Sequence, residues 1–246
     1  MSILELDIGN TRTKWRLLES AGAALRGGTD TAELRSGRLP EALVALRPQR
    51  VRAANVAGAA AAAALADWMR GLPGLSLELA QVESPCAGVT CAYRDTRRLG
   101  VDRWLALLAA HHRNPVPALV VDCGSAVTID LLDAGGRHLG GYILPGLAPM
   151  RRALDRDTDA VKAAELLNPG MSLAPGRDTD AAVNRGLPLM VLGAIDRASR
   201  ELVRDGGPEP ELWLTGGDGL FFSSLCDRSH QLIPELVLDG LALSNP

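Results

Sequence analysis

Two short stretches of the chain place an aspartate, a glycine and small residues in the same order. Residues 7–11 read Asp-Ile-Gly-Asn-Thr, and residues 122–126 read Asp-Cys-Gly-Ser-Ala. Each stretch follows an apolar run and precedes alternating apolar and polar residues, which predicts a strand, a turn and a second strand. A glycine without a Cβ and small hydroxyl or amide side chains let phosphate oxygens approach backbone N–H groups. Because the pattern occurs twice, we predict a duplicated fold that binds a nucleotide between its halves.

The two aspartates stand at the ends of strands that the sequence predicts to be buried. A carboxylate there costs free energy unless it is hydrogen-bonded, paired or near a cation. With ATP bound, Asp7 could orient Mg²⁺ through water, because Mg²⁺ keeps much of its hydration shell. Asp122 could hold a second cation. Taken alone, the first turn is equally well an ordinary hairpin turn. Other side chains that could contact phosphate are Asn10, Thr11, Lys14 and Ser125.

A third aspartate, Asp102, lies in the first turn of a predicted helix within the sequence Gly-Val-Asp-Arg. An acid there is favourable against the helix dipole without any further role. Tyr93 precedes it in a polar loop, and Arg103 follows it directly. An aspartate beside an arginine suits proton acceptance from a hydroxyl next to an anionic substrate group.

Three further motifs are weak when taken singly. Residues 140–146 carry paired glycines between a strand and a helix, and residues 215–218 read Thr-Gly-Gly-Asp after an apolar strand. Residues 175–180 precede a long helix that either Asp178 or Thr179 would cap. A capping threonine can also face a ligand.

The composition limits the class of protein. The 246 residues include 47% hydrophobic and 3% aromatic residues, with a net charge of −3. Few aromatic residues and an acidic balance argue against nucleic-acid binding. No apolar run reaches the roughly 18 residues of a membrane helix, and no signal-type segment begins the sequence. We therefore expect a soluble cytoplasmic protein without a membrane or nucleic-acid partner.

The predicted elements form two α/β halves. A strand meander over residues 2–28 begins the chain, residues 84–98 are irregular, and the proline-rich stretch 114–117 ends a helix. We predict domains over residues 1–115 and 116–246. The other expected strands cover residues 50–54, 75–80, 118–122, 126–133, 137–144 and 211–214. The expected helices cover residues 39–47, 57–70, 101–112, 146–155 and 180–204, with a last helix after Pro234.

The ordered set of motifs closely resembles the type III pantothenate kinases of the acetate and sugar kinase, Hsc70 and actin superfamily. The set reads Asp-x-Gly-Asn-Thr, Gly-x-Asp-Arg, Asp-x-Gly-Ser-Ala-x-Thr-x-Asp, Gly-Gly-x-Ile-x-Pro-Gly and Thr-Gly-Gly-Asp, and it spans residues 7–218. The resemblance implies an α/β fold of two duplicated ribonuclease-H-like (actin-like ATPase) domains, with mixed sheets flanked by helices. It also implies a homodimer and ATP-dependent phosphorylation of pantothenate to 4'-phosphopantothenate, the first step of coenzyme A biosynthesis.

The resemblance also implies roles for individual residues. Asp102 matches the catalytic base, Asp122 the ligand of a monovalent cation, K⁺ or NH₄⁺, and Ser125 the second phosphate loop. Thr179 matches a residue that contacts pantothenate across the dimer interface. The other pantothenate contacts match Tyr93, Gly100, Val101, Asp102 and Arg103. The first phosphate loop matches Asp7, Ile8, Gly9, Asn10, Thr11, Arg12, Thr13 and Lys14. The chain lacks the proline often found between the family's tyrosine and glycine.

These residues predict in-line transfer of the ATP γ-phosphoryl group to the primary hydroxyl of pantothenate, through a loose transition state. Arg103 could neutralise either the substrate carboxylate or the migrating phosphoryl group. Two alternatives stay open: a superfamily kinase of another small alcohol or acid, and a regulatory protein that binds nucleotide without turnover. The intact carboxylates Asp7, Asp102 and Asp122 argue against lost catalysis.

Overall fold

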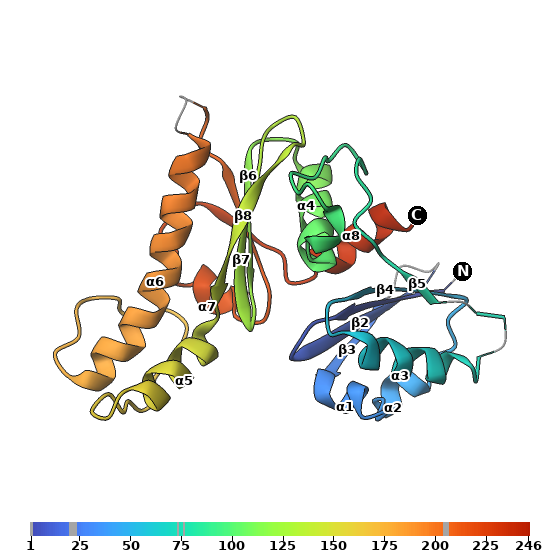
Figure 1. Cartoon of the computed structure of the whole chain (residues 1–246), viewed down its shortest axis with the longest axis horizontal. Coiled ribbons are helices and arrows are strands. Elements are labelled where there is room, and N and C mark those ends of the chain that lie inside the picture. Colours follow the sequence, from blue (N-terminus) through green and yellow to red (C-terminus); the bar gives the residue numbers. More distant parts are fainter. Residues whose placement is uncertain (1, 20–23, 73, 76, 204–206) are drawn as a thin grey trace. The chain divides into compact units, whose positions relative to one another are not determined.

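The chain forms two packing units, each built on one five-stranded sheet (Figure 1). The computed structural model describes residues 2–19, 24–72, 74–75, 77–203 and 207–246. Unit 1 consists of Met1–Ala87, Tyr93–Ala109 and Leu236–Pro246, and unit 2 of Gly88–Ala92 and Ala110–Glu235. Residues 236–246, predicted in the C-terminal half, therefore pack within unit 1. The division into domains at residues 115 and 116 stays a prediction.

The sheet of unit 1 has the strand order β3-β2-β1-β4-β5. Its first three strands form an antiparallel meander, and β4 and β5 continue the sheet parallel to β1. The register places Asp7 opposite Lys14 and Ile8 opposite Thr13. The strands are β1 (Ile3–Ile8), β2 (Arg12–Leu18), β3 (Ala24–Asp30), β4 (Arg50–Asn55) and β5 (Leu77–Leu79).

Helices cover both faces of this sheet (Figure 1). Three of them, α1 (Thr31–Arg35), α2 (Glu41–Val44) and α3 (Ala59–Met69), share a core with the alternate apolar residues of the strands. On the other face, α8 (Leu236–Ser244) contacts β1 and β4. A Cβ on Gly240 would lie 2.2 Å from the Leu105 carbonyl oxygen, so α8 also packs closely on α4 (Val101–Arg113). A 3₁₀ turn, η1 (Thr96–Arg98), precedes α4.

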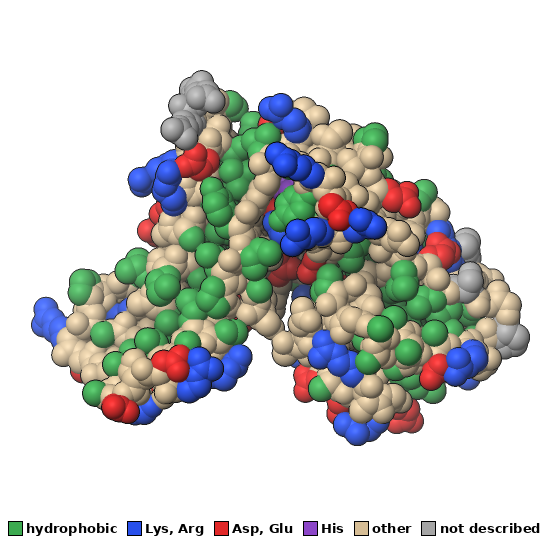
Figure 2. Space-filling view, in the orientation of Figure 1, with side chains coloured by type: hydrophobic (Ala, Val, Ile, Leu, Met, Phe, Trp, Pro, Cys, Tyr) green, Lys and Arg blue, Asp and Glu red, His purple; other side chains and the backbone are tan. Residues whose placement is uncertain are grey.

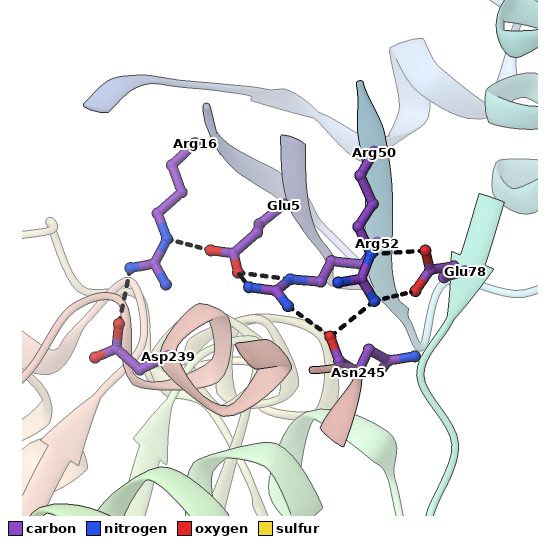
Figure 3. Close-up of polar contacts among 7 residues, drawn as sticks. All are labelled: Glu5, Arg16, Arg50, Arg52, Glu78, Asp239 and Asn245. Atoms are coloured by element: carbon purple, nitrogen blue, oxygen red, sulfur yellow. Dashed lines mark hydrogen bonds and ion pairs between the residues drawn. The ribbon is translucent and has the colours of Figure 1, made fainter. Parts of the chain in front are cut away.

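A cluster of charged side chains joins α8 to the sheet (Figure 3). Glu5 is fully buried between Arg16 and Arg52, and both arginines bond to its carboxylate. Arg16 Nη1 also bonds to Asp239 Oδ1 at 2.7 Å, and Arg52 Nη1 donates to the Asn245 carbonyl oxygen at 2.5 Å. Two members lie at the rim, where Arg50 binds both carboxylate oxygens of Glu78 at 2.8 and 2.6 Å. The C-terminal residues are thereby fixed to β1, β2 and β4.

The sheet of unit 2 repeats the arrangement, with the order β10-β9-β6-β7-β8. Again three antiparallel strands come first in the chain, and the fourth and fifth are parallel to the first. The strands are β6 (Ala118–Cys123), β7 (Ala126–Leu132), β8 (His138–Pro145), β9 (Glu211–Thr215) and β10 (His230–Leu232). The helices are α5 (Leu147–Asp157), α6 (Thr179–Leu202) and α7 (Gly219–Ser223). Two mixed sheets with one topology confirm the predicted fold class.

Most of the predicted elements are present, and the differences are confined to short ones. The expected helix over residues 39–47 is only α2, and α1 lies between the meander and that helix, where no element was predicted. Neither α7 nor β10 was expected, because five and three residues show no periodicity. Parts of the expected meander, of the strand at 75–80 and of the helix at 180–204 lie outside the described residues. Among the described helices, none has the length and apolar character needed to cross a membrane.

Candidate active site

The first Asp-x-Gly turn of the sequence connects β1 to β2 and is held by backbone contacts. We call residues 9–11 turn 1. The Gly9 N–H donates to the Arg12 carbonyl oxygen at 3.1 Å, and the Val56 N–H donates to the Ile8 carbonyl oxygen at 3.0 Å. Asn10 is exposed, as are Thr11 and Arg12. Exposed backbone at the tip of a strand pair is suited to contact a ligand.

The other predicted residues of the first phosphate loop lie in the strands beside turn 1. Asp7 and Lys14 are half-buried cross-strand neighbours on β1 and β2. The side chains of Ile8 and Thr13 are buried, at 0% and 1% exposed. Any contact that Ile8 or Thr13 makes with a nucleotide must therefore come through its backbone.

The second Asp-x-Gly turn connects β6 to β7 in unit 2. We call residues 124–125 turn 2. The Gly124 N–H donates to the Ala126 carbonyl oxygen at 3.1 Å, and the Asp218 N–H donates to the Cys123 carbonyl oxygen at 2.8 Å. The latter contact corresponds to the Val56–Ile8 contact, since each joins the end of a first strand to the segment after a fourth strand. The duplication thus extends to individual hydrogen bonds.

Two glycines from other segments pack against turn 2 and the end of β6. A Cβ on Gly146 would lie 2.2 Å from the Gly124 carbonyl oxygen, and a Cβ on Gly216 would lie 2.3 Å from Asp122 Oδ1. Gly216 also has a φ of +92°, in the left-handed region that favours glycine. The motifs at residues 140–146 and 215–218 therefore meet at turn 2, where no larger residue fits.

The side chains at turn 2 and at the end of β6 differ in exposure. Ser125 is exposed and Asp122 is half-buried. Cys123 is buried, and its burial together with the carboxylates of Asp122 and Asp218 raises the pKa of its thiol well above the usual value. A thiol that stays protonated is a poor nucleophile, so Cys123 serves as core packing beside the turn.

The predicted catalytic aspartate lies at the start of α4 in unit 1. The Arg103 N–H donates to Asp102 Oδ1 at 2.8 Å, and a Cβ on Gly100 would lie 2.5 Å from the same oxygen. Arg103 is only 5% exposed; its Nη1 donates to the Tyr93 hydroxyl at 3.1 Å, and its guanidinium lies 5.7 Å from the centre of the Tyr93 ring. The structure thus brings Tyr93, Gly100, Asp102 and Arg103 together.

A groove of about 390 Å³ runs beside this helix start. Its lining consists of residues 55–56 at the end of β4, residues 80–82 after β5 and residues 97–101 before and within α4. Arg97 is paired with Asp95 at 2.9 Å. The Arg98 side chain is exposed and has no ion pair or hydrogen bond with the described residues. The positive charge of Arg98 makes this groove a place where an anionic group could bind. The sequence analysis did not identify Arg98 as a site residue.

Thr179 is the first residue of α6 in unit 2, and it does not cap the helix. The capping side chain is Asp178, whose Oδ1 accepts from the Ala181 N–H at 2.7 Å. Thr179 is exposed and lines a groove of about 790 Å³ together with residues 176–178, 182–183 and 186–187. Its hydroxyl is thus positioned at a surface that a ligand could reach.

Comparisons with known proteins agree on one family. Residues 3–201 match a family model described as type III pantothenate kinase. A protein named type III pantothenate kinase from Pseudomonas aeruginosa is 39% identical over 250 residues, which cover 99% of both chains.

The chain belongs to the type III pantothenate kinase family.

Solved structures similar to this family member share its fold at lower identity. One is titled a conserved putative Baf family transcriptional activator from Campylobacter jejuni, with a TM-score of 0.60 and 22% identity, covering 97% of this chain and 95% of that one. Another is titled a putative 2-dehydro-3-deoxygalactonokinase from Sinorhizobium meliloti, with a TM-score of 0.57 and 16% identity, covering 98% and 97%. These similarities concern the fold, whereas family membership comes from the sequence.

Proposed function

We propose that this chain transfers the γ-phosphoryl group of ATP to the primary hydroxyl of pantothenate and forms 4'-phosphopantothenate, the first step of coenzyme A biosynthesis. Membership in the family supports the reaction. The observation that carries the proposal is the position of Asp102, whose carboxylate is held at the start of α4 beside the Tyr93–Arg103 pair. Because ATP is a cytoplasmic nucleotide, we also propose a cytoplasmic location.

In this proposal Asp102 is the catalytic base. It orients the acceptor hydroxyl and takes its proton late, since phosphoryl transfer passes through a loose transition state in which alignment and charge stabilisation matter most. The hydrogen bond from the Arg103 N–H occupies Oδ1 and fixes the direction of the carboxylate.

Pantothenate carries a carboxylate, and the groove beside α4 offers positive charge for it. We assign substrate contacts to Tyr93 and to Gly100–Arg103, with Arg98 as the exposed guanidinium at the groove. Arg103 is buried and hydrogen-bonded to Tyr93, so it holds that ring in place. It would do so whether it neutralises the substrate carboxylate or the migrating phosphoryl group. Guanidinium groups suit this task because they pair with carboxylates in a fixed geometry.

ATP is assigned to the two turns. The backbone of residues 7–14 and the Ser125 hydroxyl would contact phosphate oxygens. In the described part of the chain no group of three or more His, Cys, Asp or Glu could hold a metal ion. Asp7 alone still fits Mg²⁺, which is commonly bound through one or two carboxylates, waters and substrate phosphates.

A monovalent cation, K⁺ or NH₄⁺, is assigned to Asp122. Gly216 packs closely against Asp122 Oδ1, and the carboxylate oxygens of Asp122 are ligands that suit such an ion. Both cations would offset the negative charge of the triphosphate. Lys14, half-buried beside Asp7, adds positive charge from the protein itself.

We further propose a homodimer that involves α6. Leu189 and Met190 are adjacent on this helix and 55% and 63% exposed, and hydrophobic side chains are visible over α6 in Figure 2. Large exposed apolar residues side by side favour a protein interface over solvent. Light scattering after gel filtration tests this: M190E should shift the mass from dimer to monomer, and a monomeric wild type would refute the proposal.

The decisive experiment measures ADP release from ATP with Mg²⁺, with and without pantothenate, and with K⁺ replaced by Na⁺. We expect release that depends on pantothenate and on K⁺. Acetate and a hexose serve as alternative acceptors, because they test for another kinase of the same superfamily. ADP release that is equal with and without pantothenate would refute the proposed reaction.

A further inference from the structure

Thr31, the first residue of α1, is fully buried and contacts turn 1 through both its side chain and its backbone. Its hydroxyl donates to the Gly9 carbonyl oxygen at 2.7 Å. Its backbone N–H donates to the Thr11 carbonyl oxygen at 2.8 Å. One residue, 22 positions beyond Gly9 in the chain, therefore holds two of the three carbonyl groups of the turn.

The hydrogen positions around Thr31 follow from counting protons. The Thr13 and Thr31 hydroxyl oxygens lie 3.0 Å apart in the interior, and either could be the donor by distance alone. A hydroxyl has one proton, and Thr31 gives its proton to Gly9, whose carbonyl can only accept. Thr13 must then donate to Thr31. The three groups form a buried chain with one direction, from Thr13 through Thr31 to the Gly9 carbonyl.

This chain determines where the next backbone donor points. A trans peptide unit is planar, so the N–H of Asn10 points away from the carbonyl of Gly9. Thr31 holds that carbonyl toward the interior, and the Asn10 N–H is thereby turned outward. Asn10 is exposed, and its N–H has no hydrogen-bond partner among the described residues. A donor fixed in this way before the ligand arrives needs no reorganisation when an anion binds.

Unit 2 holds its turn from the corresponding place through a backbone N–H, without a side chain. Gly146 directly precedes α5, the helix after the third strand of its sheet, as Thr31 begins the helix after β3. The Gly146 N–H donates to the Ser125 carbonyl oxygen at 3.0 Å. No side chain fits at Gly146, because its Cβ would lie 2.2 Å from the Gly124 carbonyl oxygen. In both units a backbone N–H from the start of this helix thus holds a turn carbonyl, and in unit 1 the Thr31 hydroxyl adds a second hydrogen bond, to the Gly9 carbonyl.

The geometry points to Thr31 as a positioning residue for ATP: its hydroxyl holds turn 1 so that the Asn10 N–H faces a phosphate oxygen. This inference rests on the proposed function, in which turn 1 binds the nucleotide. Thr31 itself touches neither substrate. Its effect should therefore be on ATP rather than on pantothenate.

The test uses the full-length chain with T31V, which keeps the shape and removes the hydroxyl, and T31S, which keeps the hydroxyl. We expect T31V to raise KM for ATP and the dissociation constant for ATP by about five- to thirtyfold, as the loss of one buried hydrogen bond allows. KM for pantothenate should stay within about twofold. T31S should bind ATP nearly as wild type does. T29V is the matched control, because among the described residues the Thr29 hydroxyl bonds only to the exposed Glu33 carboxylate.

The outcomes separate this inference from the proposed function. A folded T31V with wild-type affinity for ATP would overturn the role of Thr31, as would equal losses in T31V and T31S. T31A replaces T31V if the latter does not fold, since it also lacks the hydroxyl. If wild type released no pantothenate-dependent ADP, the proposed reaction would fail, but the dissociation constant for ATP would still decide the role of Thr31.

Discussion

Glu5 and Arg52 form a buried ion pair in which Nε and Nη2 of the arginine both donate to Oε1 of the glutamate, at 2.8 and 2.5 Å. The other carboxylate oxygen of Glu5 accepts from Arg16 Nε. Glu5 is therefore the only carboxylate bonded to both arginines among the described residues. Such a cluster is stable only while its charges are balanced.

E5Q should destabilise the protein strongly while keeping the volume of the side chain. Arg16 and Arg52 are 8% and 4% exposed. In the variant, these two buried guanidinium groups would lose the carboxylate that balances their charge. Removing one partner of a buried ion pair typically costs about 3–5 kcal/mol. Equilibrium unfolding in urea measures the change. A loss below about 1 kcal/mol would mean that water reaches the cluster.

E78Q is the matched substitution at the rim of the same cluster, and its effect should depend on pH. The hydrogen bonds from Arg50 lower the pKa of Glu78 from its ordinary value of 4.5. The pair therefore stabilises the fold above that ordinary pKa, and the contribution disappears as the pH falls through the lower native pKa. We expect E78Q to cost less than about 1 kcal/mol at neutral pH and nothing in acid. Urea unfolding of both proteins at several pH values gives the difference, and a cost that grows in acid would contradict the assignment.

D102N should abolish most of the turnover without loss of the nucleotide site. The amide keeps the acceptor oxygen for the Arg103 N–H but cannot take the proton of the acceptor hydroxyl. A fall in kcat of about 10²–10⁴-fold is expected for loss of a general base. Calorimetry should find ATP binding unchanged. Near-normal kcat would remove Asp102 from its proposed role.

G216A tests the close packing at turn 2. Its φ of +92° is unfavourable for alanine, and the new Cβ would lie 2.3 Å from Asp122 Oδ1. We expect a higher KM for ATP and a weaker activation by K⁺, since both ligands are assigned to this turn. G193A is the control, because among the described residues a Cβ there meets no atom within 4 Å beyond its chain neighbours and the backbone of its own helix. Equal kinetics for the two variants would show that the close packing of Gly216 against Asp122 is not needed for either ligand.

The sequence was sufficient for the two hairpins and for the start of α4. The apolar runs and the alternation on each side of the Asp-x-Gly turns are local signals, and the structure confirms β1–β2 and β6–β7. The five-residue helix α1 was missed, because it is too short to show helical periodicity. Thr31 was missed with it. Its sequence neighbours give no sign that its hydroxyl is buried against turn 1.

The buried charges show a second limit of local reasoning. Glu5 and Arg16 occupy the polar positions of alternating strands, which normally face water. The structure covers that face with α8, a helix that follows more than 200 residues later, since Arg16 and Asp239 are 223 positions apart. The sequence correctly predicted a helix after Pro234, but no local pattern indicates the sheet on which it packs. For the same reason the meeting of Gly146, Gly216 and turn 2 could be seen only in three dimensions.

The return of residues 236–245 to unit 1 has a consequence for how the protein is made. Arg16 and Arg52 emerge early from the ribosome, yet their partners Asp239 and Asn245 are synthesised only after the whole of unit 2. Until then the face of the first sheet that α8 covers stays exposed on the nascent chain. In that state it can bind chaperones or associate with other chains. Unit 1 can therefore complete its fold only after residues 236–245 have been synthesised.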